Sequence, residues 1–191
     1  MSTNSELPTL FFETPAAWAS WLEEHTDAPG VWLKFFKKDS GVASLTYQPA
    51  LEVALCYGWI DGQAAKGDDL FYLQRFTPRR ARSVWSKRNC DIATRLVTEG
   101  RMRPAGQAQM TAAQADGRWD SAYAAASEME IPADFLEALT TNQRAADFYA
   151  TLNRTNLFSI YYRLTTAKKP ETRAKRMAQI IAMLAEGKKF H

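Results

Sequence analysis

The sequence has little cysteine and little histidine, two residues of each in 191. Neither Cys56 nor Cys90 has a second cysteine or a histidine at the spacing of metal ligands, and His25 lies far from His191. This spacing indicates neither a zinc site nor a Ser-His-Asp triad, so we expect no metal. Both cysteines fall on or near apolar stripes of predicted helices, which favours buried free thiols.

Several other signals are absent. The sequence has no glycine-rich phosphate loop of the Walker or dinucleotide type, no internal repeat and no low-complexity tract. No apolar run approaches the roughly 20 residues that a membrane span needs. The first six residues show no charged-then-apolar signal pattern. We therefore expect no cofactor, no membrane span and a location in the cytoplasm.

The composition is that of a folded protein with a large buried area. Hydrophobic residues make up 46% and charged residues 24% of the chain, which matches a globular average. Aromatic residues make up 12%, including six tryptophans, and large rings bury much surface. The length suits one domain, or one core with a helical appendage.

Charge is spread unevenly, although the net charge is only +3. Nine Lys/Arg against two Asp/Glu give residues 74–103 a charge of +7, and seven against two give residues 168–189 a charge of +5, so the remainder sums to −9. Such patches attract phosphates or carboxylates locally, but the whole chain is not basic enough for a general nucleic-acid binder. Residues 168–189 also carry an apolar stripe. They are interpreted either as a docked helix with a solvated basic face or as a contact for nucleic acid or a membrane surface.

Hydrophobic periodicity predicts an α+β fold. Thr14-Pro15 begins a helix, Gly58 ends a second one, and Ser83 or Ser86 caps a third. A small antiparallel sheet is expected from residues 31–37, 59–65 and 70–76, packed against helices. An all-helical part is expected from about residue 131, so the predicted division is 1–130 and 131–191.

Five motifs carry a resemblance to a known family. They are Cys-Tyr-Gly-Trp-Ile-Asp-Gly (56–62), Phe-Thr-Pro-Arg-Arg (76–80), Ser-Val-Trp-Ser-Lys-Arg-Asn (83–89), Glu-Gly-Arg-Met-Arg-Pro-Ala-Gly (99–106) and Ala-Lys-Lys-Pro-Glu-Thr-Arg-Ala-Lys-Arg (167–176). The first four resemble the N-terminal signature, and the last the C-terminal signature, of the bacterial YdeI/OmpD-associated family. The resemblance implies a role in stress or bacteriocin protection, and it supplies no catalytic residue.

The densest group of functional side chains lies between residues 57 and 89. Strand alternation places Trp59 and Asp61 on one face, with Ile60 opposite. A carboxylate beside an indole can act as an acid or base, or accept a hydrogen bond from a ligand. The alternative is a structural Asp61 that stabilises the turn at Gly62 or pairs with an arginine.

An arginine cluster precedes the predicted helix start. Arginine forks match carboxylates and phosphates, and a helix N-terminus adds free N–H groups. The members of this candidate anion site are Arg75, Arg79, Arg80, Ser83, Ser86, Lys87 and Asn89. Trp85 either lines a pocket or packs the helix entry against the core. The alternative for the whole cluster is a solvated basic loop, partly neutralised by nearby aspartates.

Three functions follow as hypotheses. The first is a cytoplasmic protection protein with a pocket for a small anionic or polar ligand, formed by this cluster together with Trp59 and Asp61. The second is an interaction module, in which the aromatic and basic residues of 71–89 contact nucleic acid or a protein partner. The third is an enzyme that uses Asp61, for which the sequence offers no evident nucleophile.

Overall fold

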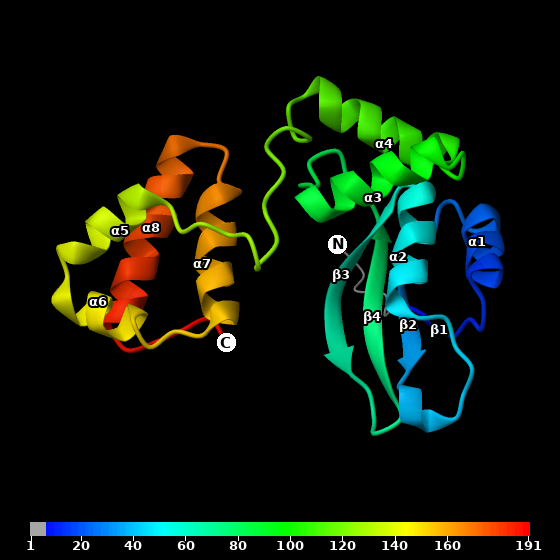
Figure 1. The fold of residues 1–191 in the computed structure, drawn as a ribbon, viewed down its shortest axis with the longest axis horizontal. Coiled ribbons are helices and arrows are strands. Elements are labelled where there is room, and N and C mark those ends of the chain that lie inside the picture. Colours follow the sequence, from blue (N-terminus) through cyan, green and yellow to red (C-terminus); the bar gives the residue numbers. More distant parts are fainter. Residues whose placement is uncertain (1–6) are drawn as a thin grey trace, which may run out of the picture. The chain divides into compact units, whose positions relative to one another are not determined.

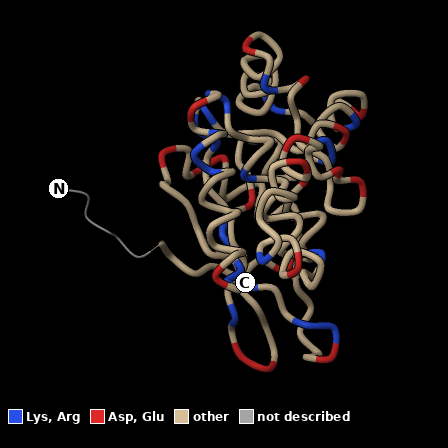
Figure 2. The backbone as a smooth tube through the Cα atoms, turned by 90° about the vertical axis from the view of Figure 1, so that its left-hand side faces the viewer, with Lys and Arg blue, Asp and Glu red and all other residues tan. Residues whose placement is uncertain are grey.

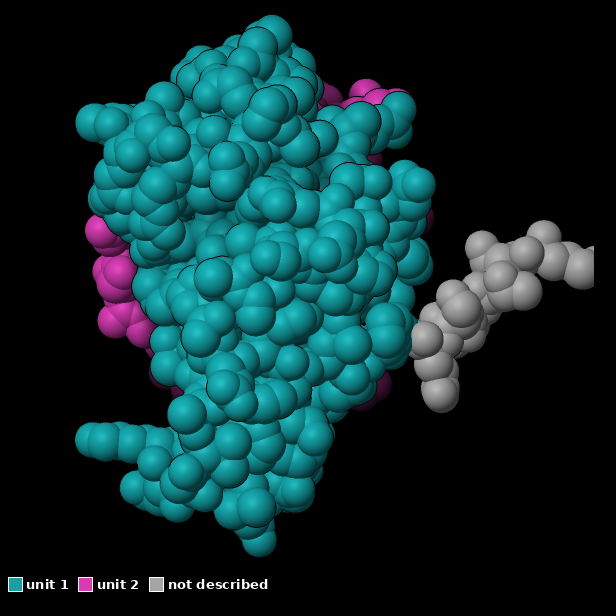
Figure 3. Space-filling view, turned by 90° about the vertical axis from the view of Figure 1, so that its right-hand side faces the viewer, with its two compact units in different colours: residues 1–85, 89–121 teal, residues 86–88, 122–191 magenta. Residues whose placement is uncertain are grey.

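The computed structural model describes residues 7–191. The chain forms two compact units, which Figure 3 distinguishes by colour. The first unit contains the residues up to Trp85 and Asn89–Ser121, and the second contains Ser86–Arg88 and Ala122–His191. Each unit has its own core, so each is described by itself.

The first unit is built on a four-stranded sheet in the order β1-β2-β4-β3. Its strands are β1 (Thr9–Leu10), β2 (Val31–Phe36), β3 (Trp59–Lys66) and β4 (Phe71–Pro78). The three predicted antiparallel strands and the α+β class are confirmed. The sheet is mixed because β1 adds a parallel edge to β2. A strand of two residues has no periodicity that the sequence could reveal.

Helices pack on one face of this sheet (Figure 1). They are α1 (Pro15–Glu24), where the Thr14 hydroxyl accepts a hydrogen bond from the Ala17 N–H at 3.2 Å, and α2 (Tyr47–Cys56). Trp18 of α1 is fully buried and packs edge-on against Trp59 and Phe76 at ring distances of 6.1 and 6.0 Å. Its indole N–H donates to the Ala50 carbonyl at 3.2 Å, which ties α1 to α2.

Two further helices, α3 (Lys87–Thr98) and α4 (Pro104–Ala115), follow the hairpin. Gly58, at the end of α2, has φ 75°, and Gly100, after α3, has φ 66°, so both occupy the left-handed conformation expected of helix stops. Of the two serines predicted as alternative caps of α3, Ser86 directly precedes the helix, and Ser83 does not cap it. Ser83 lies four residues before the helix, and its hydroxyl instead accepts the Arg80 N–H at 3.0 Å. That bond closes a loop between β4 and α3.

The second unit has the predicted all-helical part. Its helices are α5 (Ala133–Thr140), α6 (Gln143–Tyr149), α7 (Arg154–Thr165) and α8 (Pro170–Ala185). They enclose an apolar core of Phe135, Leu139, Ala145, Ile160, Leu164, Ile180 and Leu184. Asn156, 1% exposed, accepts hydrogen bonds from the Phe190 and His191 N–H groups at 3.1 and 3.2 Å. The C-terminal residues are thereby fixed to α7.

Within the described residues, no helix has the length and apolarity needed to cross a membrane. Over the same part of the chain, no three His, Cys, Asp or Glu side chains gather as metal ligands would. Cys56 and Cys90 are free and buried, as predicted.

Candidate functional site

The predicted site residues of the hairpin belong mainly to the sheet. Trp59 is 3% exposed and lies in the aromatic core, 6.1 Å from the ring of Trp21. Asp61 lies on the same face, as strand alternation predicted, and its Oδ2 accepts the Tyr47 hydroxyl at 2.8 Å. Among the described residues Asp61 has no ion pair, so the contact that the structure provides is a tyrosine on α2 and not an arginine.

Arg75 lies on the opposite face of the sheet. Its guanidinium packs on Gly62, where a Cβ atom would be 3.0 Å from the Arg75 Nε. A larger residue at position 62 would require the arginine side chain to shift by a few tenths of an ångström.

Arg79 and Trp85 form a buried stack. Arg79 is 6% exposed, its Cζ lies 3.5 Å from the centre of the Trp85 ring, and its Nη1 donates to the Val84 carbonyl at 3.2 Å. Trp85 is 2% exposed and contacts Trp119 at 4.9 Å. Trp85 therefore packs into the core, and Arg79 supports the loop that carries it.

A second buried arginine, which the sequence did not indicate, holds the same loop. Arg118 donates from Nη1 to the Ser83 carbonyl at 3.0 Å and from Nε to both Asp116 carboxylate oxygens at 2.7 and 2.8 Å. Its side chain is only 3% exposed. The loop 79–85 is thus fastened to the end of α4 by charge-assisted bonds.

The remaining predicted residues are distributed along the chain. Arg80 is exposed, Asn89 is 8% exposed within α3, and the Lys87 N–H donates to the Tyr123 carbonyl at 2.9 Å. Ser86 forms a parallel bridge with Tyr123. The structure thus joins Arg79, Ser83 and Trp85 in one loop, but it places Trp59, Asp61 and Arg75 on the sheet. Ligand binding by these residues stays a prediction.

Because Arg79 is stacked in the interior and Arg80 is exposed, we expect these neighbouring arginines to differ in their contribution to stability. We expect Arg79→Ala to lower the free energy of unfolding of the first unit by about 2–4 kcal/mol, because it removes a buried, hydrogen-bonded cation and its ring contact. Arg80→Ala, the exposed control, should change it by less than about 0.5 kcal/mol. Urea titration followed by tryptophan fluorescence measures this, since all six tryptophans lie in the first unit. Equal losses in the two variants would show that Arg79 is not structural.

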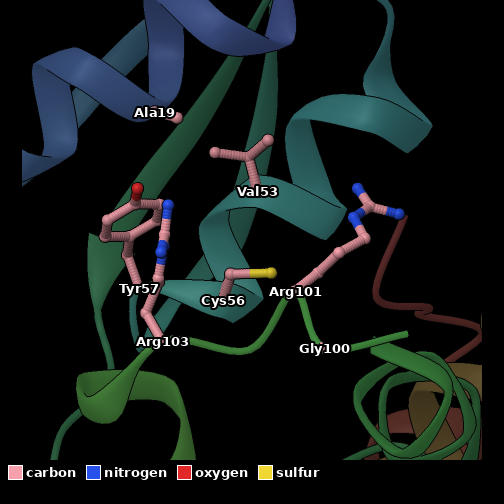
Figure 4. A pocket seen from close by; sticks show the side chains of 7 residues that line it. All are labelled: Ala19, Val53, Cys56, Tyr57, Gly100, Arg101 and Arg103. Atoms are coloured by element: carbon pink, nitrogen blue, oxygen red, sulfur yellow. The ribbon is translucent and has the colours of Figure 1, made fainter. Parts of the chain in front are cut away.

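A cavity of about 280 Å3 lies elsewhere in the first unit (Figure 4). Helix α1, the last turn of α2 and the link between α3 and α4 form it. Its lining residues are Ala19, Val53, Cys56, Tyr57, Gly100, Arg101 and Arg103. Figure 4 shows Tyr57 and Arg103 together on one side, Arg101 on the other, and Val53 and the Cys56 thiol between them. We call this cavity the α2–α4 pocket.

Arg101 is held by an ion-pair network. Its Nη1 lies 3.1 Å from Glu52 and 3.0 Å from Glu99, and Arg95 contacts the same two carboxylates at 2.6 and 2.7 Å. Burial opposes ionisation of Glu52, but hydrogen bonds from Gln48, Arg95 and Arg101 lower its pKa overall. The network is charge-balanced, so it fixes the position of Arg101 at the pocket wall.

Arg103 is held more loosely. Its closest carboxylate is Glu23 at 3.7 Å, and the side chain is 58% exposed. Its guanidinium lies 5.9 Å from the Tyr57 ring centre, while the Tyr57 hydroxyl donates to Glu23 at 2.5 Å. Burial, and then the bond to Glu23, raise the pKa of Tyr57, so the phenol stays a neutral donor. An exposed pair at this distance contributes little stability, which leaves the Arg103 donors available.

The thiol of Cys56 is buried, and burial disfavours its ionisation. Burial raises its pKa above the ordinary value, although the nearby Arg101 and Arg103 act in the opposite direction. Because the thiolate is the reactive form, the raised pKa disfavours a nucleophilic role. Cys90 is similar, since burial raises its pKa to about 11.

The pocket forms because two of the sequence motifs meet. Residues 56–62 supply Cys56 and Tyr57, and residues 99–106 supply the two arginines. The Arg103 N–H donates to the Cys56 carbonyl at 3.2 Å. A Cβ atom on Gly106 would lie 2.4 Å from that carbonyl oxygen, so only glycine allows α4 to approach the end of α2 so closely. Residues 99–106 are rich in glycine and arginine, and this was the signal available in the sequence. Only the structure shows that they form a pocket together with the end of α2.

A second, more open cavity of about 440 Å3 lies in the second unit, between α6 and the end of α8. Its polar groups, Arg144, Asp147 and Thr151, lie on α6 and the turn after it. Gln143 donates to the Asp147 carboxylate at 2.7 Å. No predicted site residue lines either of these two cavities.

Comparison with known protein families gives two matches. A family described as Domain of unknown function (DUF8412) matches residues 10–109, which include strands β2, β3 and β4 and the α2–α4 pocket. A family described as Bacteriocin-protection, YdeI or OmpD-Associated matches residues 128–187, the helical part. The second match confirms the resemblance inferred from the sequence. Neither the curated proteins nor the solved structures contain a significant match.

Proposed function

We propose that this chain binds a small anionic or polar ligand in the α2–α4 pocket. The chain belongs to the DUF8412 family, whose model matches residues 10–109, and its residues 128–187 match the family described as bacteriocin-protection, YdeI or OmpD-associated. The observation that supports the proposal is the loosely paired Arg103 beside Tyr57, opposite the fixed Arg101. Ligand binding of this kind would serve a protection role.

The shape and chemistry of the pocket favour a compact ligand. Its volume of about 280 Å3 is close to the lower end of ordinary ligand sites, about 300–1,000 Å3. Val53 and Ala19 offer apolar contact, whereas the arginines offer donors that carboxylate and phosphate oxygens can accept. A carboxylate or phosphate attached to a small apolar group combines these requirements.

Charge balance points to Arg103 as the main ligand contact. Arg101 is engaged by two carboxylates, so a ligand must compete with Glu52 and Glu99 for it. Arg103 has to give up the 3.7 Å contact with Glu23 and its interaction with Tyr57, neither of which is a close ion pair. We infer that the ligand anion binds Arg103 first and is oriented by Arg101.

The test is titration of the full chain with inorganic phosphate, citrate and AMP by calorimetry and thermal unfolding. A ligand at 100 times its Kd should stabilise the first unit by about 2.7 kcal/mol. Arg103→Ala should weaken binding at least about tenfold, because it removes a charge-assisted hydrogen bond. Arg82→Ala, also an exposed arginine, serves as the matched control. If none of the three ligands binds, or if the two variants lose affinity equally, this pocket is not the site.

The protection role needs a separate measurement in cells. Bacteria that express the chain should survive a bacteriocin challenge better than cells with an empty vector, and the Arg103→Ala variant should lose that advantage while accumulating to the same level. If cells that express the Arg103→Ala variant are still protected, the protection does not depend on the pocket.

A further inference from the structure

The sheet of the first unit has a second face that carries aromatic and basic side chains. On β2 this face contains Trp32, Lys34 and Phe36, and on β4 it contains Phe71, Leu73 and Arg75. The two strands pair antiparallel, so these residues stand opposite one another as Trp32–Arg75, Lys34–Leu73 and Phe36–Phe71. We call this surface the outer face.

The outer face differs from the core face in exposure. Val31, Leu33 and Phe35, which alternate with its β2 residues, are at most 2% exposed beneath the helices. The six outer-face residues are all partly exposed. Phe11, which follows β1, extends the face, because it is 40% exposed and packs edge-on against Phe36 at 5.3 Å. Partly exposed aromatic rings in one contiguous group are typical of a binding surface.

The aromatic rings are arranged around a cation. The Lys34 ammonium lies 4.2 Å from the Phe71 ring centre and 5.9 Å from that of Phe36, and the two rings are 5.8 Å apart. Neither Lys34 nor Arg75 forms an ion pair with a carboxylate of the described residues. Both positive charges therefore remain available for an anionic partner.

The middle of the outer face has no acidic side chain on β2 or β4, whose outward residues are the six already named and Thr77. Acidic residues occur at the hairpin end of the sheet, where Asp68 and Asp69 stand near Lys66, and Asp39 follows Lys38. Figure 2 shows basic residues (blue) and acidic residues (red) together in the loops at that end of the sheet. The uncompensated positive charge is thus confined to the centre of the face, next to the rings.

We propose that the outer face binds single-stranded nucleic acid. Bases stack on Trp32, Phe36 and Phe71, and the phosphates between them pair with Lys34 and Arg75. Aromatic platforms on a four-stranded sheet, with cations beside them, suit unpaired bases, because every base has a flat surface and every link carries a negative charge. A duplex offers the rings no free base surface, because its bases are already stacked on one another, so it should bind more weakly than a single strand. This surface is separate from the α2–α4 pocket and shares no residue with it.

The experiment uses fluorescence anisotropy of labelled 12-mer oligo(dT) and oligo(U) with the full chain, from 50 to 300 mM salt. Trp32→Ala and Phe36→Ala should each weaken binding roughly 5- to 150-fold, the range found for single stacked bases. Lys34→Gln with Arg75→Gln should reduce the slope of log K against log salt by about 1.4, since two phosphate contacts are lost. Circular dichroism verifies that each variant is folded.

The matched control is Lys175→Gln with Lys189→Gln, two exposed lysines of the second unit. It should leave the affinity for the oligonucleotides and the salt slope unchanged. Three results overturn the proposal: no anisotropy change at 50 mM salt, equal loss in the control pair, or a dimer in light scattering that Phe36→Ala dissociates. The second result would assign binding to the basic helix α8, and the third would assign the outer face to a second copy of the chain.

Discussion

Gly106→Ala is expected to lower the free energy of unfolding of the first unit by about 3 kcal/mol, through overpacking against groups that cannot move aside. The new Cβ would lie 2.4 Å from the Cys56 carbonyl oxygen, 2.5 Å from that of Leu55 and 2.5 Å from the Met102 sulfur. Two of these atoms are main chain of α2. Helix α4 would therefore have to move away from α2, and with it Arg103 at the pocket wall.

The matched control is Gly117→Ala, the same change after the end of α4. No atom lies within 4 Å of the added Cβ there, and the cost is limited to the left-handed φ of 75°, about 1 kcal/mol. Urea unfolding monitored by tryptophan fluorescence compares the two. Equal losses in the two variants would mean that α4 can move to make room for the added Cβ. That result would contradict the inference that only glycine at position 106 allows α4 to approach α2 so closely.

Trp18→Ala is expected to lower the free energy of unfolding by about 4 kcal/mol, because it leaves a large cavity in the aromatic core. The indole is fully buried and contacts four other rings: Phe12, Trp21, Trp59 and Phe76. Its N–H also joins α1 to the Ala50 carbonyl. Loss of this anchor should release α1, which carries Ala19 of the pocket.

Trp18→Phe separates the contribution of ring packing from that of the indole hydrogen bond. It keeps an aromatic ring and removes the N–H donor, so its cost should be clearly smaller than that of the alanine variant. Trp21→Ala is a further comparison, because Trp21 is only partly buried and stacks on His25 at 4.4 Å. A loss in Trp21→Ala as large as that in Trp18→Ala would contradict the assignment of Trp18 as the anchor of α1.

Helices and strands whose sequence signals lie within a few residues could be predicted without the structure. Thr14-Pro15 begins a helix because side-chain capping and proline geometry act within one turn. Gly58 and Gly100 end helices because they tolerate a positive φ. The strand from Val31 to Phe36 was placed correctly, but its apolar residues on both faces suggested coverage on both sides. That expectation is wrong, because one face of the strand is buried and the other is partly exposed. The motif at residues 167–176 was sufficient to indicate the family that matches the helical part.

The folded structure was needed to show which functional side chains are accessible and which of them lie close together. Arg79 and Arg80 are neighbours in sequence and look alike, yet one is stacked on Trp85 in the interior and the other is exposed. The pocket unites residues 56–57 with residues 100–103, because Gly106 lets α4 approach the end of α2. Burial and proximity depend on contacts between segments more than forty residues apart, and no periodicity along the chain records them.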